Sequence, residues 1–277
     1  MNNQDNPTLA ALARQGFRFK KELGQNFLFS IDVLEQIADA AGVAAGDTVI
    51  EAGAGAGSLT AVLVGRGAKV IAVELDRFLV PYLRSRFKGD PGVEIIHGDI
   101  MKLNLDAISS SYKICANLPY HISTSFITTV FRQLKGLDAG AVLLQKEVAD
   151  KVTALPGHED YGLLALAAAW YGEVRQVLTL EPAFFTPQPS IDSALVTFRR
   201  KPQCIDVDEK ALWLTIRGLF NQRRKNLLNG LKSLGAFMPA NGISWAEALE
   251  DAGVDLRRRP ETLSLAEYAA IVRAAGY

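Results

Sequence analysis

The chain has 277 residues, of which 49% are hydrophobic and 22% are charged, so the composition excludes a largely disordered protein. Its 30 Lys and Arg residues balance 30 Asp and Glu, and any binding of nucleic acid therefore requires basic residues to be segregated locally. The two cysteines, Cys115 and Cys204, are too few for a disulfide framework, and the longest apolar run, 163–171, is too short to span a membrane. We expect a cytoplasmic monomer with no membrane partner and with Cys115 as a buried free thiol.

Short apolar runs alternate with amphipathic segments between residues 30 and 145. The first segment, 32–41, is predicted to be a helix that begins with a capping box of Asp32 and Glu35 and ends at Gly42. Five predicted strands follow, at 47–53, 69–75, 93–98, 112–117 and 140–145. Because their Val, Ile and Ala residues do not alternate with polar ones, these strands should be buried on both faces. The pattern predicts an α/β fold with a doubly wound, Rossmann-like parallel sheet.

The pattern changes after Gln145. A helix and a loop are predicted over 146–162 and a helix over 163–171, followed by two strands at 173–182 and 193–201. Beyond Pro202 the sequence predicts only helices, at 208–220, 224–234, 244–253 and 264–276, the last with a capping box of Ser264 and Glu267. We therefore predict two domains, residues 1–202 with the sheet and residues 203–277 as a small all-helical domain.

A glycine-rich segment, "VIEAGAGAGSLT" (49–60), follows a predicted strand and begins a helix, which is the context of a nucleotide-binding loop. Gly53, Gly55 and Gly57 permit a tight turn and the close approach of a ligand. Ser58 occupies the place of the third glycine in the dinucleotide fingerprint, which argues against a pyrophosphate cofactor. An ordinary tight turn is the alternative interpretation.

Acidic residues end the next two strands. Glu74 lies where a carboxylate can accept hydrogen bonds from ribose hydroxyls, and Asp99 could accept one from an adenine amino group. A ligand with a ribose and an adenine but no phosphate is S-adenosylmethionine. The three strand ends together therefore predict this nucleoside cofactor.

The tetrapeptide "NLPY" (117–120) ends the fourth strand of the predicted sheet. The Asn117 side-chain oxygen and the Leu118 carbonyl could accept the two N–H groups of an adenine amine and align it with a methyl donor. Pro119 would fix the turn, and Tyr120 would stack on the base, an interaction of roughly 1–3 kcal/mol. Alone the segment could be an ordinary turn, but its place beside the glycine loop favours a site. His121 is expected to shape this turn.

Seven motifs occur in a characteristic order: "GQNFL" (24–28), "EAGAGAGSLT" (51–60), "VELD" (73–76), "GDI" (98–100), "NLPYHIST" (117–124), "FFTPQPSIDS" (184–193) and "LFNQRRKNLLNGLK" (219–232). From about Phe17 to the C-terminus they make the chain resemble the ribosomal RNA adenine dimethyltransferases, most closely the bacterial small-subunit (16S) type. The resemblance implies an S-adenosylmethionine-dependent methyltransferase domain and a helical RNA- or ribosome-binding domain. It implies as substrate two adjacent adenosines near the 3′ end of small-subunit rRNA, in the assembling small ribosomal subunit.

The resemblance also implies site residues. Those expected to contact the cofactor are Gln25, Asn26, Leu28, Gly53, Gly55, Glu74, Leu75, Asp99, Ile100 and Asn117. Those expected to hold the target adenine are Asn117, Leu118, Pro119 and Tyr120, with Phe185 as the opposing aromatic face. Ala54 departs from the family, which usually has proline there, and it predicts a less rigid loop. The three histidines, His97, His121 and His158, are scattered, so no metal is expected.

Basic residues are segregated near the C-terminus, where six of them and no acidic residue lie between Lys210 and Ala246. Four are predicted to contact RNA: Arg217, Arg223, Arg224 and Lys225. The run 257–259 could equally be a solvated face, and 14–21 forms a third basic cluster. Two alternative functions remain: a large-subunit (23S) rRNA adenine dimethyltransferase of the antibiotic-resistance type, and a ribosome-assembly checkpoint factor with secondary catalysis.

Overall fold

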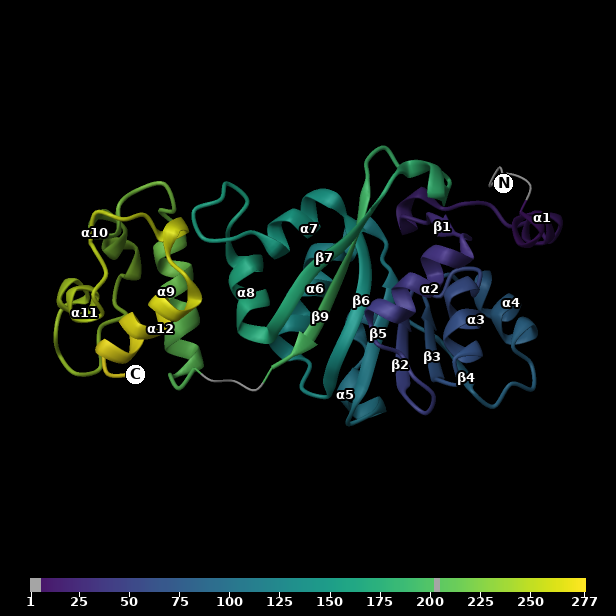
Figure 1. Cartoon of the computed structure of the whole chain (residues 1–277), viewed down its shortest axis with the longest axis horizontal. Helices are drawn as coiled ribbons and strands as arrows, with labels where there is room; N and C mark the ends of the chain where they lie inside the picture. Colours follow the sequence, from purple (N-terminus) through teal and green to yellow (C-terminus); the bar gives the residue numbers. More distant parts are fainter. Residues whose placement is uncertain (1–5, 202–204) are drawn as a thin grey trace. The chain divides into compact units, whose positions relative to one another are not determined.

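A computed structural model describes residues 6–201 and 205–277 (Figure 1). Cys204 and the end of the predicted first domain at residue 202 lie outside the described residues. The chain forms two compact units, one of residues up to 149 together with 173–200, the other of residues 150–172 together with those from 201 onward. The helical unit therefore includes a segment, 150–172, that the sequence assigned to the first domain.

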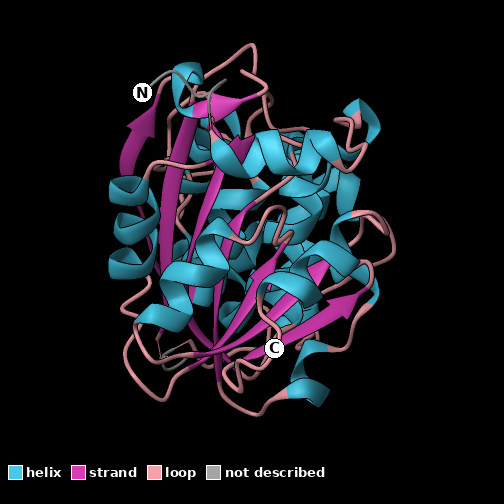
Figure 2. Cartoon of the chain, turned by 90° about the vertical axis from the view of Figure 1, so that its right-hand side faces the viewer, coloured by secondary structure: helices cyan, strands magenta, loops and turns pink. Residues whose placement is uncertain are grey.

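The first unit is built on seven strands: β2 (Thr48–Ala52), β3 (Lys69–Glu74), β4 (Val93–His97), β5 (Tyr112–Asn117), β6 (Leu137–Gln145), β7 (Gly172–Leu180) and β9 (Ser193–Arg200). They are ordered β4-β3-β2-β5-β6-β9-β7. The first five are parallel neighbours, and β9 runs antiparallel to β6. Every predicted strand is thus confirmed, and helices lie on both sides of the sheet (Figure 2). The first unit is a Rossmann-like α/β fold.

The helices of this unit are α1 (Pro7–Arg14), α2 (Ile31–Ala40), α3 (Ser58–Gly65), α4 (Leu79–Arg86), α5 (Leu105–Ile108) and α6 (Ser123–Gln133), and α7 (Lys146–Thr153) begins in it. The predicted capping box of α2 is wrong. Ser30 is the N-cap residue, and the Glu35 carboxylate instead accepts a hydrogen bond from Arg66 Nε at 2.9 Å. Two short strands, β1 (Phe27–Leu28) and β8 (Phe185–Thr186), pair antiparallel beside the main sheet.

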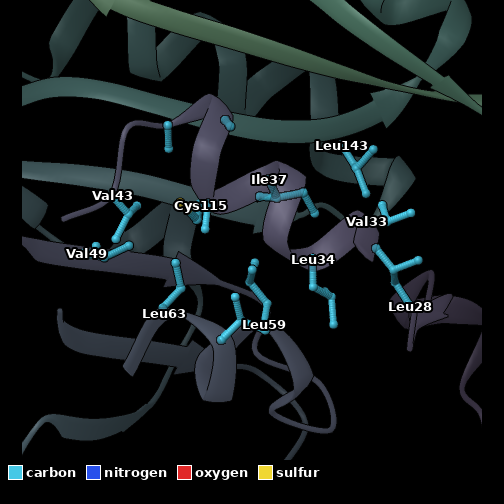
Figure 3. Packing of buried hydrophobic residues seen from close by; sticks show 14 of the residues in the cluster. Leu28, Val33, Leu34, Ile37, Val43, Val49, Leu59, Leu63, Cys115 and Leu143 are labelled. Carbon is cyan, nitrogen blue, oxygen red and sulfur yellow. The ribbon is translucent and has the colours of Figure 1, made fainter. Parts of the chain in front are cut away.

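A hydrophobic cluster holds α2 and α3 against the sheet (Figure 3). Leu34 and Ile37 of α2 meet Leu63 of α3 over Val49 and Cys115 of the strands, and all five side chains are buried. Burial raises the pKa of the Cys115 thiol, which therefore stays protonated. The prediction of a buried free thiol at this position is confirmed.

The second unit is helical, with α8 (Leu163–Tyr171), α9 (Glu209–Phe220), α10 (Leu227–Gly230), α11 (Trp245–Asp251) and α12 (Leu265–Ala274). Its packing explains why 150–172 belongs here: α8 contacts both α9 and α12, and the rings of Trp170 and Trp213 lie 6.4 Å apart. The capping box of Ser264 and Glu267 is confirmed, with the Ser264 N–H 2.8 Å from Glu267 Oε2. In the described chain no helix is long and apolar enough to cross a membrane.

Candidate functional site

A cavity lies at the carboxyl ends of β2, β3 and β5, where open parallel sheets bind their ligands. The structure brings nine of the ten residues predicted at the cofactor together around it: Gln25, Asn26, Gly53, Gly55, Glu74, Leu75, Asp99, Ile100 and Asn117. Leu28 is the exception, because its side chain packs in the hydrophobic core and borders only a smaller adjoining hollow. Residues far apart in the sequence thus share one hollow.

The glycine loop turns under this cavity because its glycines adopt backbone angles that other residues avoid. The φ angles of Gly53, Gly55 and Gly57 are +78°, +57° and +77°. A Cβ atom added to Gly57 would lie 2.8 Å from the ring of Phe87, so this glycine is required by packing as well as by conformation. The three glycines thus have the backbone conformation that the expected close turn requires.

Glu74 is the acid at the centre of the site, and its side chain is buried. Its Oε2 accepts a hydrogen bond from the Gly55 N–H at 2.7 Å, and its Oε1 accepts one from the Asp76 N–H at 2.8 Å. Burial raises the pKa of Glu74, although these backbone donors oppose the rise. Each oxygen keeps a lone pair for a further donor, so the carboxylate can both hold the glycine loop and bind a ligand hydroxyl.

Asp76 ties the N-terminal segment to the end of β3. Its fully buried carboxylate accepts hydrogen bonds from Lys20 Nζ at 2.5 Å, from Gln25 Nε2 at 2.9 Å and from the Phe78 N–H at 2.9 Å. Burial works to raise the pKa of Asp76, but these donors outweigh it and hold the pKa below its usual value. Gln25 therefore lines the cavity while its amide is fixed by Asp76, a role that the motif did not predict.

The tetrapeptide presents an oriented amide to the same cavity. Asn117 Nδ2 donates to the Asn26 carbonyl at 2.7 Å, which leaves the Asn117 side-chain oxygen as an acceptor. Pro119 lines the cavity and precedes a 3₁₀ turn, and the half-buried Tyr120 makes a 2.8 Å hydrogen bond between its hydroxyl and Ser193 Oγ. The buried Leu118 side chain anchors the segment in the core. In the described part of the chain, the Leu118 carbonyl accepts no hydrogen bond.

Phe185 does not offer an open face in this structure. Its side chain is 1% exposed, it pairs with Leu28 across β8 and β1, and it packs in the same cluster as α2. The neighbouring Phe184 is 38% exposed. Phe185 therefore has no exposed ring face on which a base could stack, because the pairing of β8 with β1 turns its side chain into the core.

Several residues of the cavity carry no predicted role: Leu23, Gly24, Phe27, Val73, Leu79, Gly98, Met101 and Ile122. Most adjoin a predicted site residue in the sequence, but Leu79 lies in α4, whose pattern indicates only a helix. His121 also lines the cavity, and a Cβ atom on Gly24 would lie 3.2 Å from its Nδ1. Its position is therefore set by the "GQNFL" segment as well as by its own turn.

A second buried acid, Glu51, lies on β2 just before the glycine loop. Burial and the nearby Glu74 together raise the pKa of Glu51 to about 8, although a hydrogen bond from Thr60 Oγ1 at 2.5 Å opposes the rise. The sequence does not single out this residue, because an acid inside a strand pattern has no characteristic spacing. Among the residues that the structure describes, no group of three His, Cys, Asp or Glu side chains could hold a metal.

The residues predicted to contact RNA lie in the helical unit, and they divide into two kinds. Arg223 is engaged, because its Nε lies 3.0 Å from Glu261 Oε2 and its Nη2 donates to the Glu159 carbonyl at 2.8 Å. Arg217, Arg224 and Lys225 are exposed, and within the described residues none of the three forms an ion pair.

The run 257–259, for which the sequence left two interpretations open, is paired throughout. Arg257 lies 3.0 Å from Asp255, Arg258 pairs with Glu267, and Arg259 lies 3.8 Å from Glu261. These charges are largely neutralised within the unit. The pairing favours the interpretation of a solvated, structural face for this run.

A model of the family described as "Ribosomal RNA adenine dimethylase" matches residues 16–271 of the chain. The chain belongs to the ribosomal RNA adenine dimethylase family. It is 40% identical over 276 residues to the "Ribosomal RNA small subunit methyltransferase A" of Geobacillus thermodenitrificans, covering 96% of this chain and 94% of that one. It is also 40% identical over 267 residues to the protein of the same name from Geobacter metallireducens, covering 94% and 96%.

Two solved structures of this type share the fold. A dimethyladenosine transferase from Plasmodium falciparum aligns with a TM-score of 0.76 at 24% identity, covering 88% of this chain and 95% of that one. The 23S rRNA methyltransferase ErmE aligns with a TM-score of 0.70 at 23% identity, covering 91% and 100%. The predicted family and the predicted methyltransferase fold are confirmed, and the chain is a methyltransferase of this family.

The buried Glu51 should make stability depend on pH. In the folded state the carboxyl binds its proton up to about pH 8, whereas in the unfolded chain it releases the proton near its ordinary pKa of 4.5. Because the unfolded state binds fewer protons in this window, the free energy of unfolding should fall as the pH rises from about 5 to about 8. Glu51→Gln, which mimics the protonated acid, should flatten the fall in urea unfolding. The exposed Glu94→Gln is the control, and an equal slope in both variants would contradict the assignment.

The ion pair of Lys20 and Asp76 should couple the N-terminal segment to the sheet. Lys20→Met leaves a buried carboxylate with one donor fewer, so Lys20→Met and Asp76→Asn should each lower the free energy of unfolding. A double-mutant cycle should give a coupling of about 1–2 kcal/mol, because the two residues are in contact. The exposed pair of Arg175 and Glu173 is the control, expected to couple by no more than about 0.5 kcal/mol. A coupling near zero for Lys20 and Asp76 would exclude this role.

Proposed function

We propose that the protein transfers methyl groups from S-adenosylmethionine to the exocyclic amines of two adjacent adenosines near the 3′ end of small-subunit rRNA. The products are dimethyladenosines, formed in the cytoplasm while the small ribosomal subunit assembles. The observation that supports this most directly is the oriented Asn117 amide, held by Asn26 at the cavity that also contains Glu74 and the glycine loop. The cavity is thus lined both by Asn117, an acceptor for an amine, and by Glu74, an acceptor for a hydroxyl.

The cavity suits the nucleoside part of the proposed cofactor. Glu74 has lone pairs for the two ribose hydroxyls, and the Asp99 carboxylate, whose Oδ1 accepts from the Met101 N–H at 3.0 Å, lies at the cavity as an acceptor for an adenine amine. Leu75 and Ile100 supply apolar surface to the adenine ring. When bound, the cofactor supplies an electrophilic sulfonium methyl group. The curated relatives named above are methyltransferases, which is consistent with this choice.

The chain's own residues would act mainly by alignment. The Asn117 side-chain oxygen and the Leu118 carbonyl accept the two N–H groups of the target amine, which holds its nitrogen toward the methyl donor. The Tyr120 ring, positioned through Ser193, lies against the base. The nitrogen becomes acidic once it is alkylated, and its proton leaves to water. No general base is then required before transfer, in agreement with an amide, not a carboxylate, at the end of β5.

Methylation of purified particles tests the function. Unmethylated small subunits, large subunits and naked rRNA are incubated with the protein and labelled S-adenosylmethionine, and the modified adenosines are mapped by mass spectrometry. We expect dimethylation of two adjacent adenosines in the small-subunit rRNA. Methylation of large subunits alone would favour the large-subunit alternative, and no methylation with retained small-subunit binding would favour an assembly factor.

Asn117→Ala should lower transfer by about 100-fold or more, because the variant has no side-chain acceptor for the amine. Asn104→Ala is the control, since it removes an exposed asparagine that caps α5 and does not line the cavity.

The exposed, unpaired cations of the helical unit should bind the RNA backbone. Arg224→Glu and Lys225→Glu should each weaken RNA binding and lower its salt dependence by about one unit of the log–log slope. Arg257→Glu provides a matched control, since this 88% exposed side chain is already paired with Asp255. Arg223→Glu is less informative, because it also breaks the contacts to Glu159 and Glu261. A salt slope unchanged from the wild type in both test variants would remove these two residues from the RNA surface.

A further inference from the structure

The methyltransferase unit carries a basic surface of its own on and around α4. Between Asp76 and Asp90 the chain contains four basic residues and no acidic one. They are Arg77, Arg84, Arg86 and Lys88, and all four side chains are exposed. Because the net charge of the whole chain is zero, this local excess of basic residues reflects a segregation of charge on the surface and not a basic chain.

These four cations differ from several other basic residues of the unit in having no acidic partner among the described residues. Arg66 pairs with Glu35 and Asp39, Lys113 lies 2.6 Å from Asp47, and Arg175 pairs with Glu173. No such pair is formed by the four cations at α4, so their field reaches the solvent. A surface of unpaired arginines attracts anions at long range, and phosphate groups are well matched to guanidinium donors.

A groove runs along this surface, lined by Gln15, Arg77, Phe78, Tyr82, Ser85 and Arg86. It lies between the end of α1 and α4, which are neighbours in Figure 1 and whose Leu12 and Leu79 share a hydrophobic cluster. Phe78 and Tyr82 are only partly buried, so the groove offers aromatic rings next to two arginines. Basic residues that track phosphates, interleaved with rings on which bases can stack, are typical of sites for single-stranded nucleic acid.

The groove and the cofactor cavity are formed by the same turn of chain. Leu75 and Leu79 line the cavity, whereas Arg77 and Phe78, which lie between them in the sequence, line the groove. A strand of RNA in this groove would therefore pass next to the cofactor cavity.

We propose that the groove between α1 and α4 binds the phosphate backbone of a single-stranded segment of the RNA substrate. This inference rests on the proposed function in that the substrate is RNA, and it adds a second contact surface to that of the helical unit. The two surfaces belong to separate compact units, so each can be altered without changing the other.

Charge reversal in the groove tests this proposal. The variant Arg77→Glu/Arg84→Glu changes Arg77, which lines the groove, and Arg84, an exposed residue of α4 outside the groove lining. It spares Arg86, whose Nη1 donates to the Ala56 carbonyl in the glycine loop. Binding of a fluorescein-labelled single-stranded RNA oligonucleotide is measured by anisotropy over a series of salt concentrations. We expect affinity to fall by about tenfold or more and the salt slope to decrease by roughly 0.7 for each phosphate that the variant no longer binds. S-adenosylmethionine binding and the melting temperature should stay as in the wild type.

The control is Arg175→Glu, which makes a single Arg→Glu change at an exposed arginine of the same unit that is already paired. Equal affinity and slope in the double variant and this control would overturn the proposal. Loss of binding to assembled small subunits with unchanged oligonucleotide binding would also overturn it, because the groove would then contact a ribosomal protein. If the double variant loses RNA binding while even the wild type methylates no subunit, the groove stands and the proposed function falls.

Discussion

The site depends first on a buried carboxylate that is bonded on both sides by backbone. Glu74, the last residue of β3, accepts one N–H from Gly55 in the glycine loop and one from Asp76, so it ties the segment after β2 to the segment after β3. Burying a charge is unfavourable unless it is hydrogen-bonded, and these two donors offset part of that cost. The same residue also lines the cavity, so the group that organises the loop forms part of the cavity wall.

The N-terminal segment joins two sides of the cavity. Gln25 is held by Asp76 after the end of β3, while the carbonyl of the next residue, Asn26, orients the amide of Asn117. Two adjacent residues therefore connect the end of β3 with the end of β5. A displacement of this segment would move the Gln25 side and the Asn117 side of the cavity together, so the two sides share one support.

Much of the fold and of the cavity could be predicted because it follows from local rules. Apolar strands, glycines that need positive φ and acids at strand ends each leave a pattern in the sequence, as at Gly53 and Glu74. What could not be predicted depends on partners distant in the chain. Which of Phe184 and Phe185 is buried follows from pairing with β1, and whether Arg223 is free follows from the loop that contains Glu159. The segment 150–172 was misassigned for the same reason, since helical periodicity does not say which neighbours bury the helix.

The pairing of β1 with β8 has a consequence for the growing polypeptide. Phe27, which lines the cavity, is synthesised early, but its partner Thr186 is among the last residues of the methyltransferase unit to leave the ribosome. Contacts between such distant segments form late, because the intervening loop must first be closed at an entropic cost. The pairing of β1 is therefore completed only when nearly the whole unit has been made. A chain truncated before β8 would contain every residue that lines the cavity but would lack the strand that pairs with Phe27 and Leu28.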